Sequence, residues 1–392
     1  MDGGSLPDAQ HPRVPGLVDL RDGQPDPALL PVALLAETAA TSITASPATT
    51  LAYGANRGPG SMIAALCDRL AVVDGSPPDP TEVLITAGAS HAIGLAIGQL
   101  ASRGDTVLVE DPTYDLAVAL FRSRGLAVEP VPMDGDGLVI DALVDRTRRL
   151  RARRRQVAFI YAIPTWHNPT GITMPLERRR EFLETVKTLE LPVLEDDTYR
   201  ELAFSGTSPP SLWSDDHDGL VTRVGTISKV LGPGLRVGWL TGSRGMIDLL
   251  ADDGVLRSGG GIAHFAATVV GRVIAGPGYD PHVQAMRGVL RHRSEALLRG
   301  LRTSDLVHAD APAGGYFAWC RAHGPRELVA ALRDNGVAVR DGAQFVMTSA
   351  TPVNGEIPFR IAFCGHDDAV LESAGRTIAA VVERATTTAR RA

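Results

Sequence analysis

Short runs of β-branched and apolar residues alternate with amphipathic stretches through the middle of this chain. The apolar runs lie at residues 83–85, 106–109, 157–160, 193–194, 221–224 and 237–240. Helical patterns separate most of them, for example at residues 61–73, 92–103 and 176–190. Because such alternation is typical of βα units, it predicts an α/β fold whose large domain is a mostly parallel, doubly wound sheet.

The ends of the chain differ from this middle. The last hundred residues combine a long helical pattern with short strands, which predicts a smaller α+β domain. The first fifty residues are rich in Pro and Thr. We therefore expect an N-terminal segment (1–50) that packs on the small domain, a large domain (51–282) and a small C-terminal domain (283–392).

Composition excludes several classes of protein. The chain has 392 residues, 44% of them hydrophobic and 21% charged, as in soluble globular proteins. A net charge of −6 disfavours nucleic acid or an anionic membrane as partner. Three isolated cysteines form no disulfide framework and no CxxC pair, so we expect no metal site and a cytoplasmic location. No signal peptide and no apolar run long enough to span a membrane is visible.

Polar groups follow five of the apolar runs at once. The segments are TAGAS (86–90), EDPTY (110–114), the HNPTG motif (167–171), EDDTY (195–199) and GTISK (225–229). In open α/β sheets, ligands bind outside the carboxyl ends of the strands. These segments therefore predict a single binding site at that edge of the sheet.

Lysine is almost absent from the chain. Only Lys187 and Lys229 among the 39 basic residues are lysine. Arginine stays protonated, whereas a lysine amine can act as a nucleophile. Lys187 lies in a polar helical pattern typical of a solvated surface, while Lys229 follows an apolar run in a Gly- and Pro-rich turn. Lys229 is therefore the candidate for covalent chemistry.

The residues at the strand ends match the needs of pyridoxal 5′-phosphate. Its aldehyde needs an amine such as Lys229, and its pyridinium nitrogen needs a carboxylate such as Asp196. Asn168 and Tyr199 can hydrogen-bond its phenolic oxygen, and Tyr114 can lie against its ring. The helix start at residues 88–90 and the cation Arg236 suit its phosphate. Taken singly, each of these residues could be a cap, a turn residue or a core aromatic.

These segments and YGANRGPG (53–60), SKVLGPGLRVGW (228–239) and FRIAF (359–363) resemble fold-type I aminotransferases of class I/II. The resemblance runs from Tyr53 to about Phe363. The segment LRDGQPDPALLP (20–31) is further similar to the branch that contains 2-aminoadipate and kynurenine aminotransferases. The resemblance to this family implies amino-group transfer between an L-amino acid and a 2-oxo acid in two half-reactions.

The resemblance also implies a role for each matching residue. Lys229 would be the Schiff-base lysine and proton shuttle, with Asp196 and Tyr199 as its catalytic partners. Arg360, Asn168 and Gly23 would contact the substrate. Tyr53 would reach the phosphate of a neighbouring subunit, which implies a homodimer with shared sites. The phosphate cup would consist of Ala89, Ser90, Thr226, Ser228 and Arg236.

The sequence departs from the family pattern at two positions, and two other classes of function are alternatives to transamination. Ala89 replaces the usual serine of the cup, and His91 stands where glutamine is common. Neither change removes a catalytic role, but His91 and Trp166 leave the side-chain specificity open. A cyclase, oxidase, decarboxylase or lyase could keep every cofactor ligand. A ligand-sensing regulator domain is disfavoured, because about 50 residues without a basic recognition helix precede Tyr53.

Overall fold

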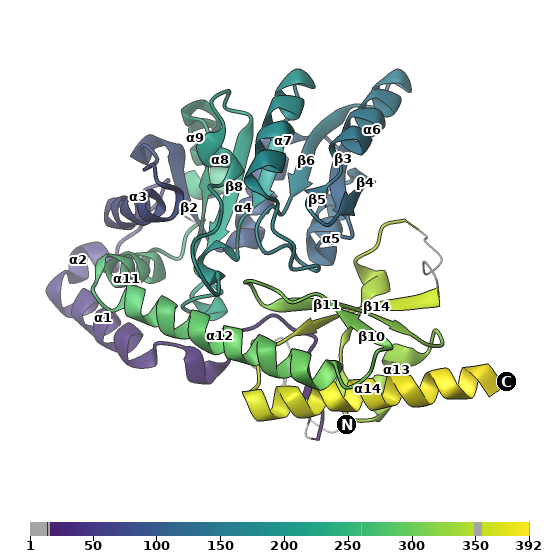
Figure 1. Cartoon of the computed structure of the whole chain (residues 1–392). Helices are drawn as coiled ribbons and strands as arrows, with labels where there is room; N and C mark the ends of the chain where they lie inside the picture. The colour runs from purple at the N-terminus through teal and green to yellow at the C-terminus, as the bar shows by residue number, and fades with distance from the viewer. Residues whose placement is uncertain (1–13, 15, 260, 349–354, 392) are drawn as a thin grey trace, which may run out of the picture.

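The computed structural model describes residue 14 and residues 16–259, 261–348 and 355–391. A large eight-stranded sheet forms the centre of one body, and a four-stranded sheet forms the second body beside it (Figure 1). The strands of the large sheet are β2 (Val83–Thr86), β3 (Thr106–Asp111), β4 (Ala127–Asp134), β5 (Gly137–Leu138), β6 (Val157–Ala162), β7 (Val193–Asp196), β8 (Val221–Thr226) and β9 (Gly238–Thr241).

The large sheet has the order β2-β9-β8-β7-β6-β3-β4-β5. Strands β4, β3, β6, β7 and β8 pair in parallel, whereas β9 is antiparallel to both β2 and β8. The central strands are buried along their whole length, as expected for parallel strands that helices cover on both faces. The predicted mostly parallel, doubly wound sheet is thus present.

Helices cover both faces of this sheet. Neighbouring strand residues such as Leu108 and Val109 belong to different core clusters, since they point to opposite faces. Helices α4, α5 and α9 pack into one cluster, and α6, α7 and α8 pack into the other. The helices of this body are α3 (Gly60–Asp74), α4 (Ala89–Leu100), α5 (Asp115–Ser123), α6 (Ile140–Ala152), α7 (Leu176–Thr188), α8 (Leu212–Asp215), α9 (Arg244–Ala251), α10 (Gly254–Arg257) and α11 (His264–Ala275), with short 3-10 turns at Pro80–Glu82, Arg200–Leu202 and Pro233–Leu235.

The second body is an antiparallel sheet covered by two long helices. Its strand order is β10-β11-β14-β13, and α12 and α14 run beneath it (Figure 1). The predicted boundary at residue 282 falls inside α12. The elements are α12 (Tyr279–Leu301), β10 (Val307–Ala309), β11 (Phe317–His323), α13 (Leu328–Asp334), β12 (Val337–Ala338), β13 (Arg340–Asp341), a 3-10 turn (Gly342–Gln344), β14 (Glu356–Ala362) and α14 (Asp368–Arg391).

The N-terminal segment touches both bodies. Strand β1 (Val18–Asp19) pairs in parallel with β12 of the small domain. After a 3-10 turn (Pro27–Leu29), helices α1 (Val32–Ala45) and α2 (Pro47–Thr50) lie against α11 of the large domain. Between them, residues 20–24 cross the space between the two bodies. No helix in the described ranges is long and apolar enough to cross a membrane.

Candidate active site

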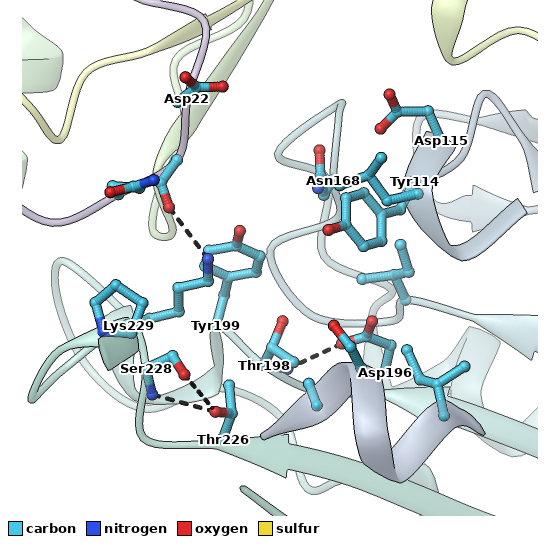
Figure 2. Close-up of a pocket in the computed structure, with 18 of the residues that line it drawn as sticks. Asp22, Tyr114, Asp115, Asn168, Asp196, Thr198, Tyr199, Thr226, Ser228 and Lys229 are labelled. Carbon is cyan, nitrogen blue, oxygen red and sulfur yellow. Dashed lines mark hydrogen bonds between the residues drawn. The ribbon is translucent and has the colours of Figure 1, made fainter. Parts of the chain in front are cut away.

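A cavity of about 910 Å³ opens at the carboxyl ends of β6, β7 and β8 (Figure 2). Loops after these strands line it on one side, and the small domain and the segment 22–24 close it on the other. Twelve of the predicted site residues line this cavity: Gly23, Ala89, Ser90, Tyr114, Asn168, Asp196, Tyr199, Thr226, Ser228, Lys229, Arg236 and Arg360. Residues that the sequence did not single out also line it: Asp22, Gln24, Asp115, Thr198, Phe317 and Arg340.

Lys229 projects into the middle of the cavity (Figure 2). Its Nζ donates a hydrogen bond of 3.1 Å to the carbonyl oxygen of Gly23 and lies 5.4 Å from the centre of the Tyr199 ring. Burial lowers the pKa of Lys229, although Cys364 and Asp196 act in the opposite direction. A lowered pKa favours the neutral amine, which is the nucleophilic form.

Asp196 is the last residue of β7 and is 4% exposed. One carboxylate oxygen accepts a 2.6 Å hydrogen bond from the hydroxyl of Tyr161, and the other accepts from the amide of Thr198. Burial raises the pKa of Asp196, while these two hydrogen bonds act to lower it. In the described part of the chain, no lysine or arginine forms an ion pair with it. Its free side faces the cavity.

Asp197 points to the opposite side of the strand end and is held by two arginines. Its carboxylate lies 2.8 Å from Arg223 Nη2 and 3.5 Å from Arg200 Nη1. The same two arginines contact Asp74, at 2.7 and 2.6 Å. These four residues, which we call the Asp74 network, are buried or nearly so and line no part of the cavity.

A phosphate-sized anion would fit between α4 and Arg236. Helix α4 begins at Ala89, so the amide groups of its first turn are unpaired, and Ala89 and Ser90 line the cavity. Arg236 adopts left-handed backbone geometry (φ 52°), and within the described part of the chain its side chain donates only to the carbonyls of Ala87 and Pro233. Gly88 is required here, because its φ is +88° and a Cβ would lie 2.7 Å from Arg236 Nη2.

Thr226 and Ser228 lie beside this helix start. The Thr226 hydroxyl is 2.9 Å from the Ser228 hydroxyl and also contacts the carbonyl of Val237 and the amide of Ser228. Thr226 is the last residue of β8, and Ser228 directly precedes Lys229 in the chain. Of the two departures from the family pattern, Ala89 lines the cavity, whereas His91 does not and accepts a 3.0 Å hydrogen bond from the amide of Ala87. Trp166 also lies outside the lining and packs against Gly314 and Gly315.

Arg360 lies at the opposite end of the cavity, on β14. Its Nη1 donates to the side-chain oxygen of Asn168 at 2.7 Å, and its Nη2 donates to the carbonyl of Arg21 at 2.6 Å. The guanidinium carbon lies 4.0 Å from the ring centre of Phe317, and Nε has no hydrogen-bond partner among the described residues. This is a buried cation whose partners are neutral, so it can receive an anionic ligand.

Tyr114 and Tyr199 form aromatic walls, and Gly23 closes the cavity. Burial raises the pKa of Tyr114 to about 12. The Tyr199 ring packs edge-on to Phe317, with ring centres 5.5 Å apart. A Cβ at Gly23 would lie 2.5 Å from Phe317, so only glycine fits this approach. Tyr53 alone among the predicted residues lies outside the cavity, with 88% of its surface exposed.

Comparison with known proteins shows which class of fold this is. The kynurenine aminotransferase of Pyrococcus horikoshii, solved in complex with PMP, superimposes with a TM-score of 0.86 at 26% identity, over 94% of this chain and 91% of that chain. The architecture is therefore that of fold-type I pyridoxal-phosphate-dependent transferases, as the sequence predicted.

Sequence comparison then identifies the family. Residues 15–378 match the model of the family described as aminotransferase class I and II, and the chain belongs to that family. The 2-aminoadipate transaminase of Thermus thermophilus is 31% identical over 345 residues, which covers 84% of this chain and 82% of that protein. The predicted family is confirmed.

A second kind of relative is a regulator. An uncharacterized HTH-type transcriptional regulator of Bacillus subtilis, YdfD, is 35% identical over 243 residues, or 62% of this chain and 49% of that protein. The chain thus matches about half the length of this relative.

Proposed function

We propose that this protein is a pyridoxal-phosphate-dependent aminotransferase that moves an amino group between an L-amino acid and a 2-oxo acid. The observation that carries the proposal is the arrangement of Lys229 and Asp196 in one cavity, with cationic groups at both of its ends. Lys229 is the one lysine that lines it. Arg236 lies at one end and Arg360 at the other, so the cavity suits a molecule with a phosphate and a carboxylate.

The residues present fit the cofactor. Asp196 is a buried carboxylate without a cationic partner in the described ranges, and burial raises its pKa, so a pyridinium nitrogen would satisfy it. Ala89, Ser90, Thr226, Ser228 and Arg236 would hold the phosphate. Asn168 and Tyr199 would bind the phenolic oxygen, and Tyr114 would stack on the ring. When bound, pyridoxal phosphate supplies an electron sink for the electron pair left at the substrate Cα.

Lys229 would carry the proton that transamination moves. Its lowered pKa makes the neutral amine more available, so Nζ can accept the proton from the substrate Cα. The carbonyl of Gly23 holds Nζ within the cavity at 3.1 Å. Asp196, as a fixed negative charge, would favour the protonated pyridine nitrogen and so strengthen electron withdrawal from Cα.

Arg360 and Asn168 would bind the substrate carboxylate. A guanidinium presents two N–H groups in the geometry of a carboxylate, and Asn168 already fixes Nη1. The same arginine would hold the amino acid and the 2-oxo acid, because both carry that carboxylate. Gly23 would contact the substrate through its backbone, since a Cβ there would clash with Phe317.

Removal of the lysine amine tests the assignment. Lys229→Ala should lose nearly all turnover, and borohydride reduction should no longer fix cofactor mass to the protein. Lys187→Ala is the matched control, because Lys187 pairs with Asp218 at the surface. Retained borohydride-dependent labelling in Lys229→Ala would refute the assignment. A screen of amino acids that follows the absorbance of the bound cofactor would identify the donor.

A homodimer with shared sites is the finer part of this proposal. Tyr53 is 88% exposed and outside the cavity, as a residue that reaches a neighbouring subunit would be. Tyr53→Phe should weaken cofactor retention while borohydride labelling of Lys229 persists. A fully active monomer in sedimentation at assay concentration would disprove it.

Ligand sensing is a second candidate function, favoured by the similarity to YdfD. A sensor would bind pyridoxal phosphate at Lys229 without multiple turnover. The alternative chemistries on this scaffold would not pass the amino nitrogen to the added 2-oxo acid: an oxidase or a lyase would release ammonia, and a decarboxylase would release carbon dioxide. Product analysis over many turnovers, with an amino donor and a 2-oxo acid together, separates all three outcomes.

A further inference from the structure

Three metal-ligating side chains converge on the outer end of the small-domain sheet: His308 of β10, His323 of β11 and Glu356 of β14. The Nε2 atoms of both histidines lie 3.7 Å from Oε1 of Glu356. The ligand atoms of all three lie within 4.8 Å of one another. Each comes from a different strand, so the sequence shows no spacing that would reveal the cluster.

The strand register explains why they meet. His323 pairs directly with Glu356, and His308 pairs with Arg321, two residues from His323. Since side chains alternate along a strand, all three lie on one face. The alternate residues of β11, such as Cys320 and Ala322, point into the core with residues of α12 and α14. The cluster is therefore on the face away from these helices.

We propose that His308, His323 and Glu356 form a site for a divalent transition metal ion of the Zn²⁺ class. Zinc binds imidazole nitrogen at about 2.0–2.1 Å and carboxylate oxygen at about 2.0–2.2 Å, so tetrahedral ligands lie roughly 3.3–3.5 Å apart. The observed 3.7 Å is close to this spacing and too long for a hydrogen bond. Two nitrogen donors disfavour Ca²⁺ and Mg²⁺, which select oxygen ligands.

The surroundings suit such an ion. The side chains of His308, His323 and Glu356 are 51%, 40% and 20% exposed, so an ion can reach them and keep water as its fourth ligand. Arg321 Nε lies 3.6 Å from Oε2 of Glu356, the oxygen that the histidines do not face. This contact orients the carboxylate and leaves Oε1 toward the histidines.

The site is separate from the cavity but shares a strand with it. None of the three residues lines the cavity. Arg360 lies four residues along β14 from Glu356 and therefore on the same face, about 13 Å away at roughly 3.3 Å per residue. A bound ion would join β10, β11 and β14, and would stabilise the sheet that carries Arg360 without touching the cofactor.

Cobalt titration of the cofactor-loaded protein tests the proposal. We expect one equivalent of Co²⁺ to bind with the visible absorbance of a four-coordinate ion, and Zn²⁺ to displace it. Zn²⁺ should also raise the unfolding temperature, because a ligand that binds only the folded state stabilises it. The absorbance of the bound cofactor should not change during the titration.

Variants then assign the ligands. His308→Ala, His323→Ala and Glu356→Gln should each weaken Co²⁺ binding by about tenfold or more, since each removes one metal bond. His292→Ala, on the exposed face of α12, is the matched control and should bind as the wild type does. Unfolding temperatures without metal verify that each variant is folded. Wild-type affinity in the three variants, or binding only at several weak sites, would overturn the proposal.

Discussion

Asp196 and Asp197 are neighbours in the chain, yet their surroundings are opposite. Asp196 faces the cavity, accepts hydrogen bonds from Tyr161 and Thr198, and has no cationic partner in the described ranges. Asp197 faces away and is held by Arg200 and Arg223 within the Asp74 network. Ion pairs within the protein compensate the buried charge of Asp197, whereas a ligand in the cavity would compensate that of Asp196. At the end of β7, Asp197 thus contributes to stability, whereas Asp196 is available for chemistry.

The largest expected effect is on stability and concerns the Asp74 network, which holds Asp197. Arg223→Met should lower the free energy of unfolding by about 3–5 kcal/mol, because it removes one of the two cations that the buried carboxylates of Asp74 and Asp197 share. Chemical denaturation measures this loss. Arg299→Met, which removes an exposed pair with Glu372, is the control and should cost less than about 1 kcal/mol.

Lowering the pH should reduce the difference in unfolding free energy between the wild type and Arg223→Met. Burial acts to raise the pKa of Asp74, but Arg223 and Arg200 outweigh it and hold the pKa below the usual value of 3.8. A lowered carboxyl pKa contributes stability above the unfolded-state pKa, and this contribution is lost as the pH falls through the folded-state pKa. A gap between wild type and Arg223→Met that stayed constant through that acid range would contradict the network's role.

The next effect is on the chemical side. Asp196→Asn should lower kcat by about 10²-fold or more, since the pyridinium loses its counter-charge. The apoprotein should be at least as stable as the wild type at neutral pH, because burial raises the pKa of Asp196 and its ionisation opposes folding. Asp197→Asn should show the reverse: lower stability, with kcat per folded molecule nearly unchanged. If Asp197→Asn were the slower enzyme, the two roles would be exchanged.

A smaller effect is expected at the far end of the cavity. Arg360→Lys should lower kcat/KM by about 2 kcal/mol, roughly 30-fold, for both half-reactions, because a lysine cannot bind a carboxylate in bidentate fashion. The absorbance of the bound cofactor should stay as in the wild type. Amines without a carboxylate should not distinguish the variant from the wild type; equal losses with them would assign Arg360 to the fold instead.

The smallest effect concerns Tyr161, the hydrogen-bond donor to Asp196. This hydrogen bond lowers the pKa of Asp196 against the effect of burial, so Tyr161→Phe should raise that pKa further. Cofactor affinity should then fall off at a higher pH on the acid side, with a loss of about 1 kcal/mol. Phe121→Leu, beside the Tyr161 ring, is a control that should leave the pH profile in place.

Local patterns predicted much of the fold and the candidate site. The apolar runs became β2, β3, β6, β7, β8 and β9, because each is long enough to be buried and is bounded by turn residues. Parallel strands end at one edge, so the polar residues after five runs meet in one cavity. These inferences need only the period of the pattern and the direction of the strands.

Features that depend on distant segments were not predicted. Strand β4 carries Pro130 and Pro132 and was missed, since prolines are tolerated there only because the strand lies near the edge of the sheet. Tyr161 directly follows the apolar run at residues 157–160, and only its position beside β7 shows that its hydroxyl donates to Asp196. The 2.5 Å pair of Arg340 with Asp115 joins residues 225 positions apart and places a third arginine at the cavity, besides Arg236 and Arg360.

The short stretch at residues 21–23 supplies main-chain oxygens to both Arg360 and Lys229. A carboxylate that reaches Arg360 would share the guanidinium with the peptide oxygen of Arg21, and covalent use of Lys229 must break its contact with Gly23. The free energy of ligand binding is therefore reduced by the cost of breaking a contact with the backbone of this stretch. Substitutions at Leu20 and Arg21, which do not line the cavity, should thus tune affinity without altering a side chain that contacts the substrate.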